Sequence, residues 1–170
     1  MSDLGFVEVE IAPHLHSPTL PIYSSLGNPA AGAYPSFVAS QTAWTKLLSF
    51  HGRLVTSAVV ATRVAIVTAT LGDGEVAWRV QAGVTQTASL TYSYSFLAEL
   101  AGNSLSGNQA GGYTAQPLPR QWMPPGTSFE LYTLNEDAGD QWSQVMTAFE
   151  LAQPPDSAVR HYLQPHQAIS

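Results

Sequence analysis

Charged side chains are scarce in this chain of 170 residues. Only 11% of the residues are Asp, Glu, Lys or Arg, against roughly 25% in a typical soluble domain. The hydrophobic fraction of 45% is ordinary, so the polar surface must be built from Ser, Thr, Asn, Gln and backbone groups. Charge is also the property most depleted at protein–protein interfaces. The composition therefore fits a protein that hides its surface in an assembly, and it equally fits a weakly charged β protein.

Clusters of basic residues are absent too. The chain carries a net charge of −6, and its six basic residues are scattered along the sequence: Lys46, Arg53, Arg63, Arg79, Arg120 and Arg160. Binding to phosphates needs Lys and Arg side chains gathered on one surface. We therefore do not expect nucleic acid as a partner.

Cysteine is missing altogether, which excludes disulfides, thiolate nucleophiles and Cys-ligated zinc. Residues 1–10 contain three carboxylates and no Lys or Arg, unlike the basic start of a signal peptide. No apolar run approaches the ~20 residues that a membrane-spanning helix needs. We expect a soluble chain without a membrane partner.

Alternation of apolar and polar residues with a period of two is the strongest pattern present, and it is typical of half-buried strands. It recurs at residues 7–11, 76–81, 90–96, 129–131 and 145–151. Residues 53–70 are rich in β-branched side chains on both faces, which predicts two buried strands with a break near residues 61–63. Turn sequences separate these runs at residues 71–74, 102–112, 123–126 and 135–140.

Seven or so strands without a helical crossover predict an all-β fold, a single antiparallel β-sandwich that is jelly-roll-like. Residues 41–48 are the one helix candidate, because Trp44, Leu47 and Leu48 have helical spacing; the same residues also fit the start of a strand.

Proline and glycine set the flanks apart from the middle of the chain. We predict a strand followed by a Pro/Gly-rich arm over residues 1–45, the β-sandwich over residues 46–152 and a C-terminal arm over residues 153–170. Such arms are commonly disordered, and in shells and tubes they can instead become ordered on a neighbouring subunit. Tyr23, Tyr34 and Tyr162 are the interface candidates, since each is an aromatic residue flanked by flexible chain.

Three stretches occur in an order and spacing that resemble a known group of proteins. They are FHGRLVTSAVVATRV at residues 50–64, QTASLTYSYSF at residues 86–96, and LPRQWMPPGT at residues 118–127 followed by DAGDQWS at residues 137–143. Over residues 47–151 the chain resembles minor structural or head-associated proteins of tailed phages. The resemblance implies a β-sandwich that packs on other particle proteins, and it brings no catalytic residue.

Several residues in these stretches have structural interpretations of their own. We expect Arg63 to pair with a carboxylate or to cap carbonyls near the rim of a sheet. Asp140 and Gln141 are expected to close a loop by bonding backbone N–H groups. Trp142 is expected to anchor the core or its rim.

The sequence offers little support for catalysis or metal binding. His14 and His16 have no third ligand nearby, and no Gly-x-Ser-x-Gly elbow is present. Glu136, Asp137 and Asp140 share one loop and could hold Ca²⁺, but the EF-hand spacing is missing. We expect no metal, no cofactor and no enzyme activity.

The leading hypothesis is a bacteriophage virion structural protein, a capsid decoration, cement or minor head protein that acts through protein–protein contacts. Its expected partners are other virion proteins, first the major capsid protein, and further copies of itself. It would reside in the virion, assembled in the host cytoplasm. Two alternatives remain open: a component of the tail or neck, or a carbohydrate-binding module that stacks sugars on aromatics among Trp44, Trp78, Trp122 and Trp142. An enzyme is the hypothesis that the sequence supports least.

Overall fold

A computed structural model of the chain describes residues 20–98 and 112–152. These residues form nine strands: β1 (Ile22–Gly27), β2 (Ser36–Val38), β3 (Trp44–Val55), β4 (Val64–Thr70), β5 (Val76–Gln81), β6 (Thr91–Leu97), β7 (Tyr113–Pro117), β8 (Ser128–Leu134) and β9 (Gln141–Ala152). The strand predicted at residues 7–11 and the arm predicted at residues 153–170 lie outside the described residues.

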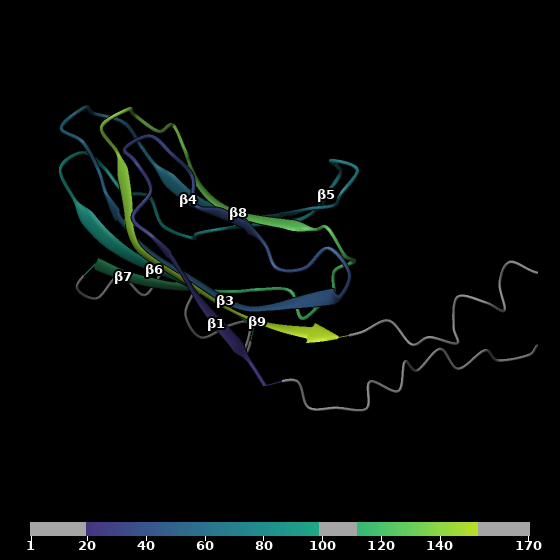
Figure 1. Cartoon of the computed structure of the whole chain (residues 1–170). Coiled ribbons are helices and arrows are strands. Elements are labelled where there is room, and N and C mark those ends of the chain that lie inside the picture. Colours follow the sequence, from purple (N-terminus) through teal and green to yellow (C-terminus); the bar gives the residue numbers. More distant parts are fainter. Residues whose placement is uncertain (1–19, 99–111, 153–170) are drawn as a thin grey trace, which may run out of the picture. The chain divides into compact units, whose positions relative to one another are not determined.

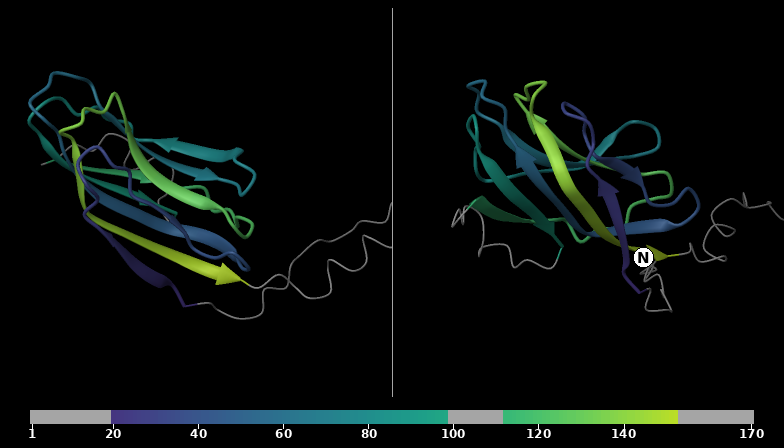
Figure 2. Two further views of the ribbon diagram at one scale, coloured as in Figure 1. Left: turned by 45° about the horizontal axis from the view of Figure 1, so that its top comes forward. Right: turned by 60° about the vertical axis from the view of Figure 1, so that its left-hand side comes forward.

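The strands form two sheets that pack face to face, as the all-β prediction required. One sheet has five strands in the order β1-β9-β3-β6-β7, and the other has four in the order β2-β8-β4-β5. Figure 1 shows them as two layers, with β4, β8 and β5 in one and β1, β9, β3, β6 and β7 in the other. Two further views of the same layers are given in Figure 2.

The connectivity is that of a jelly roll. Four antiparallel pairs are nested along the chain: β1 with β9, β2 with β8, β3 with β6, and β4 with β5. The β3–β9 and β4–β8 pairings join these pairs into the two sheets. Because β1, β2 and β3 pair with strands that lie much later in the chain, the core closes only when distant segments meet. The predicted jelly-roll-like sandwich is therefore confirmed.

β7 is an addition to this plan and departs from the predicted all-antiparallel arrangement. It runs parallel to β6 at the edge of the five-stranded sheet. Parallel neighbours cannot be joined by a tight hairpin, because the chain must return along the length of the strand. This requirement accounts for the long Gly/Ser/Asn-rich connection that follows β6 in the sequence.

Aromatic and aliphatic side chains from both sheets fill the space between the layers. Phe50, Tyr94, Phe96 and Trp142 are fully or almost fully buried on the five-stranded sheet, and Phe129, Leu131 and Val67 are fully buried on the four-stranded sheet. Phe37 on the short β2 lies against the rings of Phe50, Phe129 and Phe149 at centroid distances of 5.8, 5.4 and 5.6 Å.

The predicted domain boundary at residue 46 is wrong, because the sandwich begins before it. Residues 20–43 supply β1 and β2, an edge strand of each sheet, and so belong to the sandwich. Leu26 on β1 packs on the core, as Phe37 on β2 does. Short strands broken by Pro and Gly show little periodicity, so this segment was predicted as an arm although its apolar side chains are needed inside.

Of the two alternatives left open for residues 41–48, the start of a strand is confirmed and the helix is wrong. Residues 44–48 are the beginning of β3, where the pairing with β9 shifts register between Leu47 and Ser49. The extra residue, Leu48, places two leucines side by side and breaks the period of two. That irregularity mimics helical spacing. Among the described residues no helix is long and apolar enough to cross a membrane.

The tight turns follow the prediction. In the β4–β5 hairpin Gly74 has φ = +92° and its N–H donates to the Leu71 carbonyl at 2.9 Å. Gly126, two residues before β8, has φ = +80°. Both conformations favour glycine because a Cβ is strained at positive φ.

Candidate functional site

One end of the sandwich is organised around a buried ion pair. Arg63, just before β4, donates from Nε to Oδ2 of Asp140, just before β9, at 2.8 Å, and both side chains have no exposed surface. The guanidinium also donates to the carbonyls of Val59 and Ala61 at 2.7 and 3.2 Å and to the Ser57 hydroxyl at 3.0 Å. The prediction that Arg63 pairs with a carboxylate and caps carbonyls is confirmed.

The carboxylate of Asp140 is equally well satisfied. Oδ1 accepts from the N–H of Ser57 at 2.8 Å, and Oδ2 accepts from the N–H of Asp137 at 2.9 Å. Burial alone would raise the pKa of Asp140, but the hydrogen bonds and the neighbouring positive charge outweigh burial and lower it. The predicted loop-closing role of Asp140 is confirmed. Gln141 differs, because its Nε2 points to the Pro29 carbonyl at 3.5 Å.

Gln86 extends this network inward, and nothing in the sequence singled it out. It exchanges two backbone hydrogen bonds with Arg63, both 2.9 Å. Its buried amide donates to the carbonyls of Leu54 and Leu90 and accepts from the hydroxyl of Tyr94 at 3.0 Å. A lone glutamine between strands gives no periodic signal, so only the packing reveals its role.

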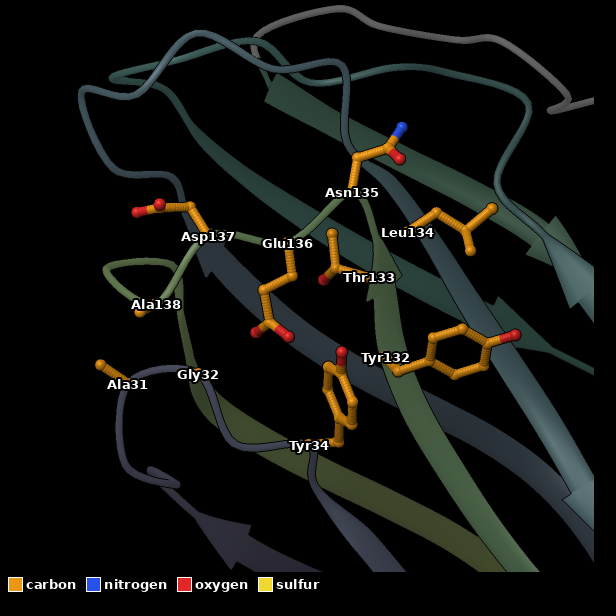
Figure 3. A pocket seen from close by; sticks show the side chains of 10 residues that line it. All are labelled: Ala31, Gly32, Tyr34, Tyr132, Thr133, Leu134, Asn135, Glu136, Asp137 and Ala138. Carbon is orange, nitrogen blue, oxygen red and sulfur yellow. The ribbon is translucent and has the colours of Figure 1, made fainter.

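A pocket of about 550 Å³ lies beside the ion pair, at the end of β8 and along the β8–β9 connection. Figure 3 shows Glu136 of the β8–β9 connection pointing toward the hydroxyl of Tyr34, with Tyr132 of β8 next to them. Small residues leave the opposite wall open. The lining residues are Ala31, Gly32, Tyr34, Tyr132, Thr133, Leu134, Asn135, Glu136, Asp137 and Ala138.

The pKa values of two ionisable groups in this pocket, Glu136 and Tyr34, differ from their ordinary values. Burial raises the pKa of Glu136 and the charge of Asp140 adds to the rise, while the hydrogen bond from Tyr34 opposes it. That same hydrogen bond, helped by burial, raises the pKa of Tyr34 to about 12. Oε1 of Glu136 is buried without a hydrogen-bond partner, as is the Thr133 hydroxyl. Glu136 Oε1 can therefore accept a further hydrogen bond, and the Thr133 hydroxyl can accept or donate one.

The three carboxylates of the 135–140 loop do not converge on a cation. Asp140 forms an ion pair with Arg63, and Asp137 Oδ1 accepts from the Gly139 N–H at 3.0 Å. Glu136 accepts a hydrogen bond from the Tyr34 hydroxyl. Among the described residues no three His, Asp or Glu side chains are grouped as metal ligands. His14 and His16 lie outside that part of the chain.

A second surface of interest is the outer face of the five-stranded sheet. Tyr23 on β1, Met146 on β9 and Tyr113 on β7 point away from the core and are 80%, 54% and 66% exposed. Neutral side chains, with Ser and Ala among them, fill most positions between them. The charged groups on the strands there are Arg53 and the Lys46–Glu150 pair, whose Nζ and Oε2 atoms lie 3.5 Å apart.

His51 lies in the middle of this face and does not add charge to it at neutral pH. Its Nδ1 is 3.0 Å from the Ser95 hydroxyl on the neighbouring β6. Burial lowers the pKa of His51, so the imidazole is neutral at pH 7. His51 therefore adds a polar but uncharged group to the face.

The three predicted interface tyrosines do not form one site. Tyr23 lies on the outer face of the five-stranded sheet, whereas Tyr34 lines the pocket near the other sheet, with its ring 5.8 Å from that of Tyr132. Tyr162 lies outside the described residues.

The four tryptophans do not form a sugar-stacking platform either. Trp142 is fully buried, Trp78 and Trp122 are half-buried, and only Trp44 is exposed, at 38%. In the pocket the rings of Tyr34 and Tyr132 meet edge to face at 63°, and the guanidinium of Arg79 lies 5.7 Å from the Tyr132 ring centroid. Neither the described tryptophans nor the Tyr34–Tyr132 pair offers two coplanar exposed rings to a sugar.

Comparisons with known proteins give little further guidance. No protein-family model matches the sequence, and no curated protein matches it. One solved structure, described as the structure of infectious bursal disease virus Gx strain, aligns with a TM-score of 0.31 and 9% identity. The alignment covers 85% of this chain and 43% of that one, and a likeness of this degree carries no conclusion about fold or function.

Proposed function

We propose that the chain is a structural protein of a tailed-phage particle, a capsid decoration, cement or minor head protein that works through protein–protein contacts. The observation that carries the proposal is the weakly charged outer face of the five-stranded sheet, with Tyr23, Met146 and Tyr113 exposed on it. Tyr and Met are enriched at protein interfaces, and charge is depleted at their centres.

Two further points support this function. Residues 47–151 resemble minor structural and head-associated phage proteins in the order and spacing of three stretches. Jelly rolls are also frequent among viral capsid domains, although a fold by itself does not specify a function. The expected partners are the major capsid protein and further copies of this chain in the virion. Burial of neutral surface would hold them together, and the proposed role involves no catalysis.

The test of the proposal is the number of copies per purified particle, measured by quantitative mass spectrometry. A number in the hundreds supports a coat or cement role. A small multiple of three or six, as ring symmetry gives, supports a place at the neck or tail. Absence of the chain from particles overturns the proposal.

A charge placed on the outer face should block attachment without unfolding the chain. We expect Tyr23→Lys to raise the dissociation constant for attachment at least tenfold, about 1.4 kcal/mol of binding free energy, and so to lower the copy number per particle. The thermal midpoint should barely change, because exposed substitutions usually cost under about 0.5 kcal/mol.

Val60→Lys is the matched control, since Val60 is 90% exposed in the β3–β4 connection and away from this face. It should attach like the unmodified chain. Normal attachment of Tyr23→Lys would show that this face is not the interface.

A further inference from the structure

We propose that the pocket beside Glu136 binds the guanidinium group of an arginine side chain presented by a partner protein. This inference does not rest on the proposed function, because the pocket lies near the four-stranded sheet and can be tested with a small probe. Figure 3 shows the groups concerned, with the carboxylate of Glu136 and the hydroxyl of Tyr34 directed toward each other.

The first argument is the hydrogen-bonding capacity of the pocket. Glu136 Oε1 has no hydrogen-bond partner, and an ionised carboxylate only accepts. Thr133, which is 2% exposed, lines the same pocket, and its hydroxyl is also without a partner. A ligand that satisfies the carboxylate must supply a hydrogen-bond donor, the Thr133 hydroxyl can accept from one as well, and unpaired buried polar atoms make such a ligand favourable.

The second argument is the charge around the pocket. Glu136 and Asp137 line it, and Glu130 is near enough to affect the Tyr34 hydroxyl. The Asp140–Arg63 pair next to it is neutral as a unit. Arg79 is the opposing cation, and it lies over the Tyr132 ring. The local excess is therefore negative, which attracts a cation and repels an anion.

The third argument selects guanidinium among cations. Two tyrosine rings stand beside the carboxylate, and Arg stacks on aromatic faces while its fork of N–H donors matches a carboxylate. Lysine offers a point charge without the planar fork. The size, about 550 Å³, exceeds what one side chain end needs, so a backbone segment can approach with it.

The proposal is tested by titrating the protein with N-acetylarginine amide and, separately, with N-acetylcitrulline amide, its neutral isostere. Binding is followed through backbone amide chemical shifts. We expect the arginine compound to bind with a dissociation constant on the order of millimolar, with the shifts centred on residues 132–138. The citrulline compound should bind at least tenfold more weakly.

Glu136→Gln should lower the affinity for the arginine compound at least tenfold. This variant should remain folded, because the raised pKa of Glu136 means that its charge opposes folding at neutral pH. Glu75→Gln in the distant β4–β5 turn removes the same charge and is the control; it should bind normally.

The affinity should also fall as the pH drops through the raised pKa of Glu136, since only the ionised carboxylate pairs with the cation. The neighbouring titratable and charged groups are Tyr34, Tyr132, Glu130, Asp137, the Asp140–Arg63 pair and Arg79. Equal binding of the two compounds, unchanged affinity in Glu136→Gln, or no binding of the arginine compound each overturns the proposal.

Discussion

Replacing Asp140 with asparagine should lower the free energy of unfolding by about 3–5 kcal/mol, the usual cost of removing one partner of a buried ion pair. The carboxylate receives three N–H donors, from Arg63, Ser57 and Asp137, over its two oxygens. Asparagine offers one oxygen, so its NH₂ group must face at least one of these donors. The buried guanidinium would also lose its counter-charge. Urea denaturation followed by tryptophan fluorescence measures the change.

Two comparisons separate the buried pair from surface charge. Glu150→Gln breaks the partly exposed pair with Lys46 and should cost at most about 1 kcal/mol. Arg63→Met combined with Asp140→Asn removes both charges and should cost less than the sum of the single changes, because no unpaired buried charge remains. A loss below 1 kcal/mol in Asp140→Asn would contradict the structural role of the pair.

The ion pair also gives the stability a defined dependence on pH. The pKa of Asp140 is lower in the folded chain than its ordinary value of 3.8. Ionised Asp140 therefore contributes stability that is fully present above that value and is lost as the pH falls through the lower, folded value. Asp140→Asn should lack this part of the acid destabilisation, and denaturation curves between about pH 5 and pH 2 would show it.

Trp142→Ala should have an effect of similar size, about 3–5 kcal/mol, because it empties the centre of the core. The indole of Trp142 is fully buried, and its ring meets Tyr94 edge to face at 5.6 Å. The Trp142 indole also packs close to the backbone of Gly52 on β3. A Cβ at Gly52 would lie 2.9 Å from Trp142 Cε3 and 2.8 Å from Leu131 Cδ2.

Gly52→Ala tests this close approach. Alone it should cost about 1–3 kcal/mol through overpacking. In the Trp142→Ala background the clash with the indole is gone and the Leu131 side chain can move into the vacated space, so Gly52→Ala should cost less there. Chemical denaturation of the four chains of this cycle gives the coupling. Equal costs in both backgrounds would show that the indole is not what excludes a side chain at Gly52.

The sequence by itself determined the fold class and most of the strands. A period of two marks β5, β6 and β8, and Gly and Pro mark the turns that bound them, because these signals depend only on neighbouring residues. Arg63 and Asp140 were also recognisable: Arg63, at the start of an apolar strand, was expected to pair with a carboxylate or cap carbonyls, and Asp140 was expected to close a loop through backbone N–H groups. The sequence did not show that these two would be partners of each other.

Tertiary structure alone decided what depends on contacts between distant segments. β1 and β2 have weak local patterns and belong to the sandwich because Leu26 and Phe37 are needed in its core. The parallel pairing of β7, which is an addition to the nested pairs, and the meeting of Tyr34 with Glu136 also depend on tertiary contacts. Local periodicity reports which face of a strand is buried, but it carries no information about which strand lies beside it, and the candidate pocket is built from that second kind of contact.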